Sequence, residues 1–515
     1  MRTCRMASVG FACVALTVAV ATAAKTNYVS LAGTNVSSPF TSWGLSTTNI
    51  QDAITDTVAG DTVLVSNGTY YINSQISIAN AITVKGLAGA AETIVARAAS
   101  GTNAPYHRIF NITANATLDG FTAQNGCLTN MLPAAGTAQG AGLWMSAGTA
   151  QYCVVRYNSF LKQANDFNSA GAGVYLSGNA WLQFSQIVSN SCGAGGSVCG
   201  DGAGVYVAGD NCVVYSNTIA WNTNADEGGG INLGRGKAVG CTIENNMAFG
   251  GSGAYLVNYN SSLLSNCIIR YNSTTPNSYG AAGVHAGNGP LYVTDCTIVS
   301  NTSTVAGVPG GLSAATAGGG PCYIRRCSIM GNTAPKYAGA YVNMGATGNR
   351  AVNLDNCLIA NNNGPYSLYI DAVKDVARIR NCTIYAQKDY GITLTTTGVW
   401  PVVLNTIVYG HGTNIYSTNA VWLADFLTNS FTFCCSPQLT APGYNNVSDN
   451  PLFADLTAKN YHLKDVSPCA NAGSTAVWTD YHSDLERVDH GSLVNIGCYE
   501  TLVKTVSHGS MVLVR

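Results

Sequence analysis

Two acidic residues occupy equivalent places in the sequence, each directly before a glycine-rich stretch. Asp201 precedes "GAGV" and Glu227 precedes "GGGI", with Asp226 next to Glu227. Carboxyl groups held together can work as a general acid and base, because repulsion between like charges raises the pKa of one of them. They can also bind Ca²⁺ through oxygen ligands, which makes Asp201 and Glu227 a candidate calcium site. The plainer interpretation is a set of solvated acids at the ends of loops.

Two basic residues and one aromatic residue stand near these acids in the sequence. Arg235 and Lys237 follow Glu227 within the same repeat unit, and Trp221 precedes it. The two cations can neutralise a uronate or the acids themselves, or they can form ion pairs at the surface. The indole can stack on a sugar or pack at a corner of the fold. Asp201, Asp226 and Glu227 are therefore the candidate catalytic residues, and Arg235, Lys237 and Trp221 are the candidate binding residues.

A repeat in the middle of the chain decides whether these residues meet. The pattern Cys-x-[Ile/Val]-x-x-Asn, or a close variant, occurs ten times between Cys153 and Gly410, at intervals of 23–32 residues. Glycine-rich stretches such as "GAGVYL" and "GGGINL" precede several of these copies. The spacing gives Asp201 and Glu227 the same place in two adjacent units.

The repeat predicts short strands that stack in successive coils. Within each copy the Cys and Ile/Val positions are two apart, so both side chains face the same side of a strand. Short β-rich units without a helical period are typical of a β-solenoid, whose coils lie about 4.8 Å apart. The cysteines then form an interior ladder and the asparagines form a ladder at a corner. Metal binding by the cysteines is the alternative, but their spacing far exceeds that of a zinc site.

The glycine-rich stretches that alternate with "xxIxxN" resemble the right-handed parallel β-helix repeats of pectin-lyase-like proteins. They also resemble the repeats of polymorphic outer-membrane proteins. Residues 48–86 are similar to the opening coils of secreted bacterial β-helix proteins, in which a segment such as "IQDAITDTV" caps the open end. Residues 450–473 and 494–500 are similar to the closing segment of that group. The resemblance implies an all-β, right-handed parallel β-helix of about ten to thirteen coils, with an N-terminal cap and an irregular C-terminal closing segment.

The N-terminal segment of the chain suggests export. Arg2 and Arg5 precede an apolar stretch, and "ATA" at 21–23 fits a cleavage site. We therefore predict a signal peptide at 1–23, a β-helix with its cap at 24–430, a closing segment at 431–500 and a tail of unknown role at 501–515. No later stretch of the sequence is apolar and long enough to span a bilayer.

Composition and cysteine content narrow the range of functions. Only 10% of the residues are charged and the formal net charge is -1, which argues against a nucleic-acid partner. Disulfides are possible in an exported protein. Cys192 with Cys199, and Cys469 with Cys498, are the two pairs that we expect from their positions in the chain.

Two functions fit these observations. The first is a secreted or cell-surface protein, an adhesin or polysaccharide binder, that acts without catalysis and as a monomer. The second is a secreted carbohydrate-active enzyme, a polysaccharide lyase or glycoside hydrolase, that works at the acidic face of Asp201, Asp226 and Glu227. In both cases the predicted partner is a polysaccharide or cell-surface glycan, and calcium is the one cofactor that the acids suggest.

Overall fold

The computed structural model describes residues 23–35, 37–98, 105–129, 138–161, 169–193, 200–224, 226–257, 262–276, 278–287, 289–315, 320–344, 351–372, 376–386, 388–395, 399–475, 485–486 and 494–500. Three predictions fall wholly or largely outside these residues. They are the signal peptide, the disulfide of Cys192 with Cys199, and the tail at 501–515.

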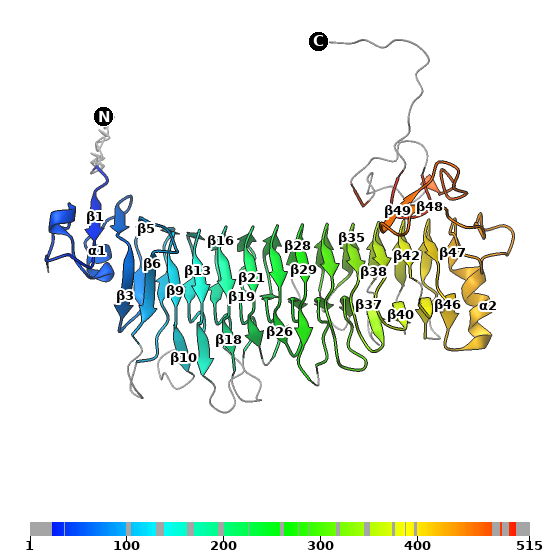
Figure 1. The fold of residues 1–515 in the computed structure, drawn as a ribbon, viewed down its shortest axis with the longest axis horizontal. Helices are drawn as coiled ribbons and strands as arrows, with labels where there is room; N and C mark the ends of the chain where they lie inside the picture. The colour runs from blue at the N-terminus through cyan, green and yellow to red at the C-terminus, as the bar shows by residue number, and fades with distance from the viewer. Residues whose placement is uncertain are drawn as a thin grey trace, which may run out of the picture.

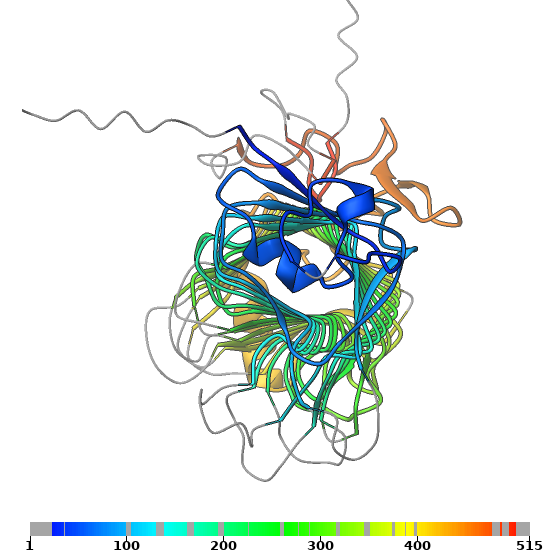
Figure 2. The same cartoon turned by 90° about the vertical axis from the view of Figure 1, so that its left-hand side faces the viewer.

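The described chain winds into a long stack of coils that forms a rod (Figure 1). Three long parallel sheets run along this rod. In a view along the axis the coils superimpose, and α1 (Ile50–Thr55) lies over the N-terminal end (Figure 2). Two of the sheets have 13 strands, so the predicted right-handed parallel β-helix of about ten to thirteen coils is confirmed.

The strands of the three long sheets follow one another in a fixed order along the chain. Sheet A consists of β1 (Thr26–Val29), β2 (Thr62–Val65), β5 (Thr83–Gly86), β8 (Thr117–Asp119), β12 (Thr149–Gln151), β16 (Trp181–Gln183), β20 (Val213–Tyr215), β24 (Lys237–Val239), β28 (Ser262–Ser265), β32 (Leu291–Thr294), β35 (Cys322–Arg325), β38 (Val352–Asp355), β41 (Ala377–Arg380), β44 (Val402–Leu404) and β47 (Phe431–Thr432). Sheet B consists of β3 (Gly68–Ile72), β6 (Thr93–Arg97), β9 (Thr122–Gln124), β13 (Val154–Arg156), β17 (Gln186–Val188), β21 (Thr218–Ala220), β25 (Thr242–Glu244), β29 (Ile268–Arg270), β33 (Thr297–Val299), β36 (Ser328–Met330), β39 (Leu358–Ala360), β42 (Thr383–Tyr385) and β45 (Ile407–Tyr409). Sheet C consists of β4 (Ile76–Ile78), β7 (Phe110–Ile112), β11 (Leu143–Met145), β15 (Val174–Leu176), β19 (Val205–Val207), β23 (Ile231–Leu233), β27 (Ala254–Val257), β31 (Val284–Gly287), β34 (Leu312–Ala315), β37 (Tyr337–Met344), β40 (Tyr366–Ala372), β43 (Tyr390–Leu394) and β46 (Thr413–Ser417).

The remaining elements are short. Sheet D lies between sheets B and C in the chain and consists of β10 (Cys127–Thr129), β14 (Ser159–Leu161), β18 (Ser191–Cys192), β22 (Thr223–Asn224), β26 (Met247–Ala248) and β30 (Ser273–Thr274). A 3-10 helix, η1 (Trp43–Leu45), belongs to the N-terminal region, and α2 (Ala420–Asn429) lies at the C-terminal end of the rod (Figure 1). In the part of the chain that the structure describes, no helix is long and apolar enough to cross a membrane.

The predicted cysteine ladder lies inside the rod, beside a column of isoleucines. Cys241, Cys267 and Cys296 are all buried, and each thiol contacts backbone carbonyls of the coil before it, as in Cys241 Sγ to Val214 O at 3.5 Å. A small, weakly polar thiol fits this interior position without leaving a strong donor unsatisfied. Burial of the isoleucine column removes apolar surface from water at every rung and stabilises the stack.

The predicted asparagine ladder lies at the corner between sheets B and D. Asn246 Nδ2 donates to Asn272 Oδ1 at 3.1 Å, and Asn272 Nδ2 donates to Asn301 Oδ1 at 2.9 Å. Each Oδ1 also accepts from the backbone N–H of the preceding ladder residue, as in Asn246 N to Asn272 Oδ1 at 2.9 Å. These side chains therefore satisfy one another and the turn backbone in a buried corner, which fixes the vertical register of the coils.

The C-terminal part of the chain turns back along the outside of the rod. β48 (Phe453–Asp455) pairs antiparallel with β49 (Asn460–Leu463), and both lie over the later coils (Figure 1). The rings of Phe453 and Tyr461 pack on Tyr385 of β42, each with a centroid distance of 5.5 Å. The closing segment thus covers the outer side of sheet B.

The predicted disulfide between Cys469 and Cys498 is wrong for this structure. Cys469 is a free thiol, buried in the apolar cluster between the closing segment and sheet B. The thiol of Cys469 forms a hydrogen bond with the thiol of Cys435, which follows the last coil. The prediction paired Cys469 and Cys498 because they flank the closing segment, whereas the way this segment folds back brings Cys469 to Cys435.

Candidate functional site

The acids Asp201 and Glu227 stand on adjacent rungs, as the repeat predicts. Gly202 N donates to Glu227 O at 2.8 Å, and Gly171 N donates to Asp201 O at 2.9 Å. The glycine after each acid has a left-handed backbone, with φ of 67° at Gly202 and 72° at Gly228. A Cβ on Gly202 would lie 2.5 Å from the Val205 carbonyl oxygen. Glycine is therefore needed at this turn, which leads from the acid into the sheet C strand.

Next to the acids, the outward side of sheet C carries a row of aromatic side chains. In register these are Trp144, Tyr175 and Tyr206, then Asn232, Tyr255 and His285. The rings of Tyr175 and Tyr206 stack with centroids 5.6 Å apart, and those of Tyr255 and His285 stack at 5.1 Å. The Tyr255 hydroxyl donates a hydrogen bond to the Glu227 carboxylate. The acids and the aromatic row thus form one surface, which we call the carboxyl–aromatic face.

Burial and the charges of neighbouring acids raise the pKa of both Asp201 and Glu227. Burial raises the pKa of Asp201 to about 7, and the nearby charges of Glu227 and Asp226 add to the shift. Burial likewise raises the pKa of Glu227 to about 7, partly opposed by the hydrogen bond from Tyr255. Among the described residues, neither carboxylate takes part in an ion pair that would offset its burial. Near neutral pH the pair therefore carries about one proton.

Burial also shifts the pKa values of two aromatic residues of this face, Tyr206 and His285. Burial raises the pKa of Tyr206 to about 12, and the charge of Asp201 contributes. Burial lowers the pKa of His285 to about 4, so its imidazole is neutral at physiological pH. Near neutral pH the face therefore presents uncharged phenol and imidazole groups beside two carboxyl groups that can each gain or lose a proton. Carboxyl groups with such shifted pKa values are typical of acid–base catalysis.

The other predicted site residues lie at varying distances from this face. Asp226 adjoins Glu227, and its charge raises the pKa of both acids. Arg235 lies near Tyr206, whose pKa its charge lowers, and its Nη1 is 3.4 Å from Asp210 Oδ2. Lys237 begins β24 on sheet A with an exposed side chain. Trp221 is 62% exposed at the corner before β22, with φ of 59°. The structure therefore groups the three acids, brings Arg235 near Tyr206 of the same face, and places Lys237 and Trp221 elsewhere.

A calcium site at Asp201 and Glu227 stays a prediction. Among the residues that the structure describes, no group of three or more His, Cys, Asp or Glu side chains is arranged to hold a metal ion. Two carboxylates alone provide few of the oxygen ligands that Ca²⁺ requires.

The tyrosines of the face are functional candidates that our reading of the sequence missed. Tyr175, Tyr206 and Tyr255 each occupy the fifth position of a glycine-rich stretch, in "GAGVYL", "GAGVYV" and "GSGAYL". Their apolar neighbours on either side point inward, so strand alternation puts the fifth position outside. An aromatic residue that recurs at an outward position was the available signal.

Comparisons with known proteins return structures but no sequence relatives. No family model and no curated protein matches the chain. A pectate lyase, Pel9A, is 11% identical, with 92% of this chain and 96% of that chain covered and a TM-score of 0.32. The A-module of mannuronan C-5 epimerase AlgE6 from Azotobacter vinelandii is 13% identical, with 72% of this chain and 93% of that chain covered and a TM-score of 0.29. The catalytic unit of a GH87 alpha-1,3-glucanase from Streptomyces thermodiastaticus is 15% identical, with 72% and 64% covered and a TM-score of 0.29.

These neighbours are β-helix proteins of the pectin-lyase-like kind that the sequence resembles. At such low identities and scores they carry no information on the activity of this chain. The resemblance to repeats of polymorphic outer-membrane proteins stays a prediction.

Proposed function

We propose that this protein binds a polysaccharide along its carboxyl–aromatic face and hydrolyses it, with Asp201 giving its proton to the leaving glycosidic oxygen while Glu227 either takes a proton from the attacking water or attacks the sugar itself. The observation that carries this proposal is the pair of half-buried carboxyl groups on adjacent rungs, whose pKa values both rise to about 7. Buried like charges cost folding free energy, and such an arrangement is concentrated at functional sites. Cleavage of a glycosidic bond by hydrolysis needs one carboxylic acid and one carboxylate, which is the state of this pair near neutral pH.

The surroundings assign different roles to the two acids. Glu227 receives the hydrogen bond from Tyr255, and such a bond favours the ionised form. Asp201 has burial and repulsion to raise its pKa. Asp201 is therefore the group that keeps the proton and serves as general acid, and Glu227 is the base or nucleophile. Tyr255 is a positioning residue that holds the Glu227 carboxylate.

A polymeric substrate fits the shape of the face. The outward row of sheet C carries three further rings beyond the acids, in the register order Ser313, Tyr341, Tyr369, Thr393 and Tyr416. Rings with a polar hydroxyl at one end suit the mixed apolar and hydroxylated surface of sugars. Arg235, which lies near Tyr206, is the candidate contact for a uronate.

The experiment is an assay of the purified protein on neutral and uronate-rich polysaccharides, with and without Ca²⁺. New reducing ends report hydrolysis, and new ultraviolet absorbance from unsaturated ends reports a lyase. We expect Asp201→Asn and Glu227→Gln each to lower the rate by about 100-fold or more, which is the usual contribution of a general acid or base. Glu244→Gln is the matched control, because Glu244 lies on sheet B and pairs with Arg270, outside this face. Full activity in both site variants would contradict the assignment.

Binding without catalysis is the second candidate function, and the length of the aromatic row favours it. A single catalytic centre does not require rings over so many coils, whereas a docking surface for a long glycan does. Retention of a polysaccharide in a pull-down, with no product from any substrate, is the result expected for this candidate.

Export is part of the same proposal. A polysaccharide-cleaving protein meets its substrate outside the cell, and the predicted signal peptide at 1–23 would take it there. Amino-terminal sequencing of the protein from the culture medium tests this, with a mature chain that begins near residue 24 as the expected result.

A further inference from the structure

The three long sheets all begin at the N-terminal end of the rod, and two of their edge strands are covered. At β1 of sheet A, Tyr28 N donates to Phe40 O at 2.8 Å, and Thr47 N donates to Tyr28 O at 3.2 Å. At β4 of sheet C, Ser77 N donates to Gln51 Oε1 at 2.7 Å, and Gln51 Nε2 donates to Ser77 O at 3.2 Å. Main chain covers one edge and a side-chain amide from α1 covers the other. Such protection is usual, because an open edge is a template for pairing with another strand.

The edge of the third sheet, at β3, is left open by the described part of the chain. Gly68 N donates to Glu92 O at 2.7 Å, and Ala98 N donates to Ile72 O at 2.9 Å, so alternate residues of β3 point to β6. Thr69 and Tyr71 therefore direct their N–H and C=O groups to the other side. β3 is the terminal strand of its sheet, and no described backbone group pairs with Thr69 or Tyr71 on that side. The Tyr71 residue is 70% exposed.

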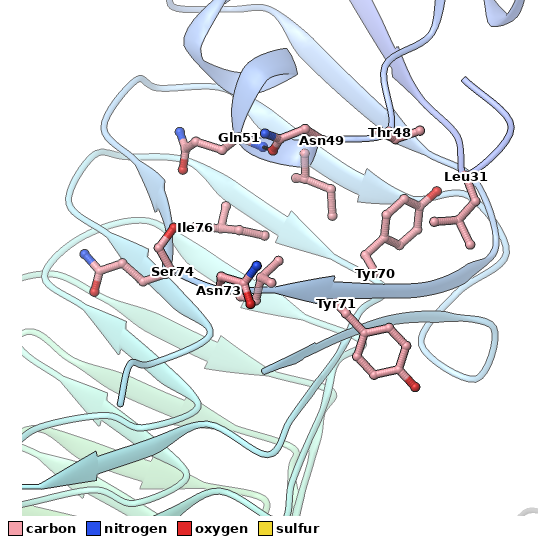
Figure 3. Close-up of a pocket in the computed structure, with 12 residues that line it drawn as sticks. Leu31, Thr48, Asn49, Gln51, Tyr70, Tyr71, Asn73, Ser74 and Ile76 are labelled. Carbon is pink, nitrogen blue, oxygen red and sulfur yellow. Dashed lines mark hydrogen bonds between the residues drawn. The ribbon is translucent and has the colours of Figure 1, made fainter. Parts of the chain in front are cut away.

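A cavity of about 540 Å³ lies against β3, between this strand, the turn that leads to β4 and the beginning of α1 (Figure 3). Its lining includes apolar parts of Leu31, Ile50 and Ile76 and the amides of Asn49 and Asn73. No charged side chain is among its lining residues. Tyr70 and Tyr71 point to opposite sides of β3, as strand alternation requires (Figure 3).

We propose that the open edge of β3 and this cavity together form a binding site for an extended, uncharged peptide strand of a partner protein. The row of alternating N–H and C=O groups at Thr69 and Tyr71 matches an extended main chain, which is the basis of recognition by strand addition. One apolar side chain of the added strand enters the cavity, where Leu31 and Ile50 contact it. The uncharged lining selects against a charged side chain at that position, because a buried charge without a partner is costly.

The probe is a capped hexapeptide, acetyl-Asn-Thr-Ile-Ala-Trp-Asn-amide, which copies residues 217–222 of sheet B. We expect saturable binding to the full chain. Tyr71→Pro removes an N–H that does not serve the pairing with β6, and proline is tolerated at such an edge position. This variant is expected to bind the peptide at least tenfold more weakly, while Tyr71→Ala, the matched control that keeps the N–H, stays within about twofold. Equal binding by the two variants, or no binding by the unmodified protein, would overturn the proposal.

Two further measurements keep the test independent of folding and of the proposed activity. Two N-methylated versions of the hexapeptide block alternate sets of N–H groups, and only one version is expected to lose binding; loss in both or in neither contradicts strand pairing. Circular dichroism and thermal melting identify any variant that fails to fold. Asp201→Asn is expected to bind the hexapeptide normally. Sedimentation that shows a dimer abolished by Tyr71→Pro would overturn the proposal in favour of a second copy of this chain as occupant.

Discussion

Two groups of charged residues in this rod stand on adjacent rungs, and they are arranged in opposite ways. In sheet A, Arg325, Asp355 and Arg380 follow one another in register, so that a carboxylate lies between two cations. Arg380 Nε and Nη2 donate to the two oxygens of Asp355 at 2.7 and 2.9 Å. On the carboxyl–aromatic face, the adjacent rungs instead carry Asp201 and Glu227, two acids that repel each other.

The difference shows what the same scaffold does with buried charge. At Asp355, which is 3% exposed, both neighbours compensate the charge through bidentate and ionic contacts. Such a group contributes to a defined packing of the coils. Asp201 has no such cation, and its raised pKa keeps the carboxyl uncharged up to about pH 7. Ionisation of both acids above that pH costs folding free energy. The fold pairs Asp355 with two cations, whereas Asp201 forms no ion pair among the described residues. We therefore interpret the acidic pair as a functional feature and not as a structural one.

The largest effect is expected from the compensated region. Asp355→Ala leaves Arg325 and Arg380 without the carboxylate that they share, in a largely buried place. We expect the free energy of unfolding to fall by about 3–5 kcal/mol, the usual cost of breaking a buried ion pair on one side. The midpoint of urea unfolding measures it. A loss below about 1 kcal/mol would show that the two regions differ less than their geometry indicates.

An opposite and pH-dependent effect is expected at the acidic pair. Because the pKa of Asp201 is raised from 3.8 to about 7, the folded protein holds this proton more tightly than the unfolded chain does. The contribution of the protonated Asp201 carboxyl to the free energy of unfolding is complete below about pH 4 and is lost as the pH rises through about 7. Asp201→Asn removes this dependence, so it should stabilise the fold by about 1–3 kcal/mol at pH 8 relative to its effect at pH 4. Paired urea unfolding curves at the two pH values test it, and an equal effect of the substitution at both pH values would contradict it.

A smaller change separates repulsion from burial within the pair. Glu227→Gln removes one neighbouring charge but leaves the burial of Asp201 and the charge of Asp226, so the pKa of Asp201 should fall and still lie above its ordinary value. Carboxyl ¹³C chemical shifts measured against pH report the change. An unchanged pKa would mean that Glu227 does not act on Asp201.

The smallest effect is expected from a half-buried pair that serves as the control for both regions. Glu244 and Arg270 also lie on adjacent rungs, with Arg270 Nε 2.6 Å from Glu244 Oε2, but their side chains are 21% and 40% exposed. Glu244→Ala should change the free energy of unfolding by less than about 1 kcal/mol, since solvent screens such a pair. A change as large as that of Asp355→Ala would contradict the importance of burial in this comparison.

Much of this fold follows from the repeat. The recurring Cys, Ile and Asn positions predict the interior ladder, the corner ladder and the stacking of Asp201 on Glu227, because identical spacing forces identical places in successive coils. The partners of the acids did not follow from it. Tyr255 reaches Glu227 from the next coil, and it occupies an outward position of its strand, whereas the Cys, Ile and Asn positions that define the repeat are buried. The pairing of Cys469 with Cys435 depends on how the closing segment folds back, which no local spacing encodes. Whether the signal peptide and the calcium site exist remains a prediction.

The most direct test of the central claim is the titration of the two acids in the folded protein. With aspartate and glutamate labelled at their carboxyl carbons, and with Asp201→Asn and Glu227→Gln to assign the signals, the chemical shifts against pH give both pKa values. The account predicts that Asp201 and Glu227 titrate near pH 7, well apart from the bulk of the carboxylates. Titration of both groups in the ordinary range of about 3.5–4.5 would contradict it and leave the acids without a chemical role.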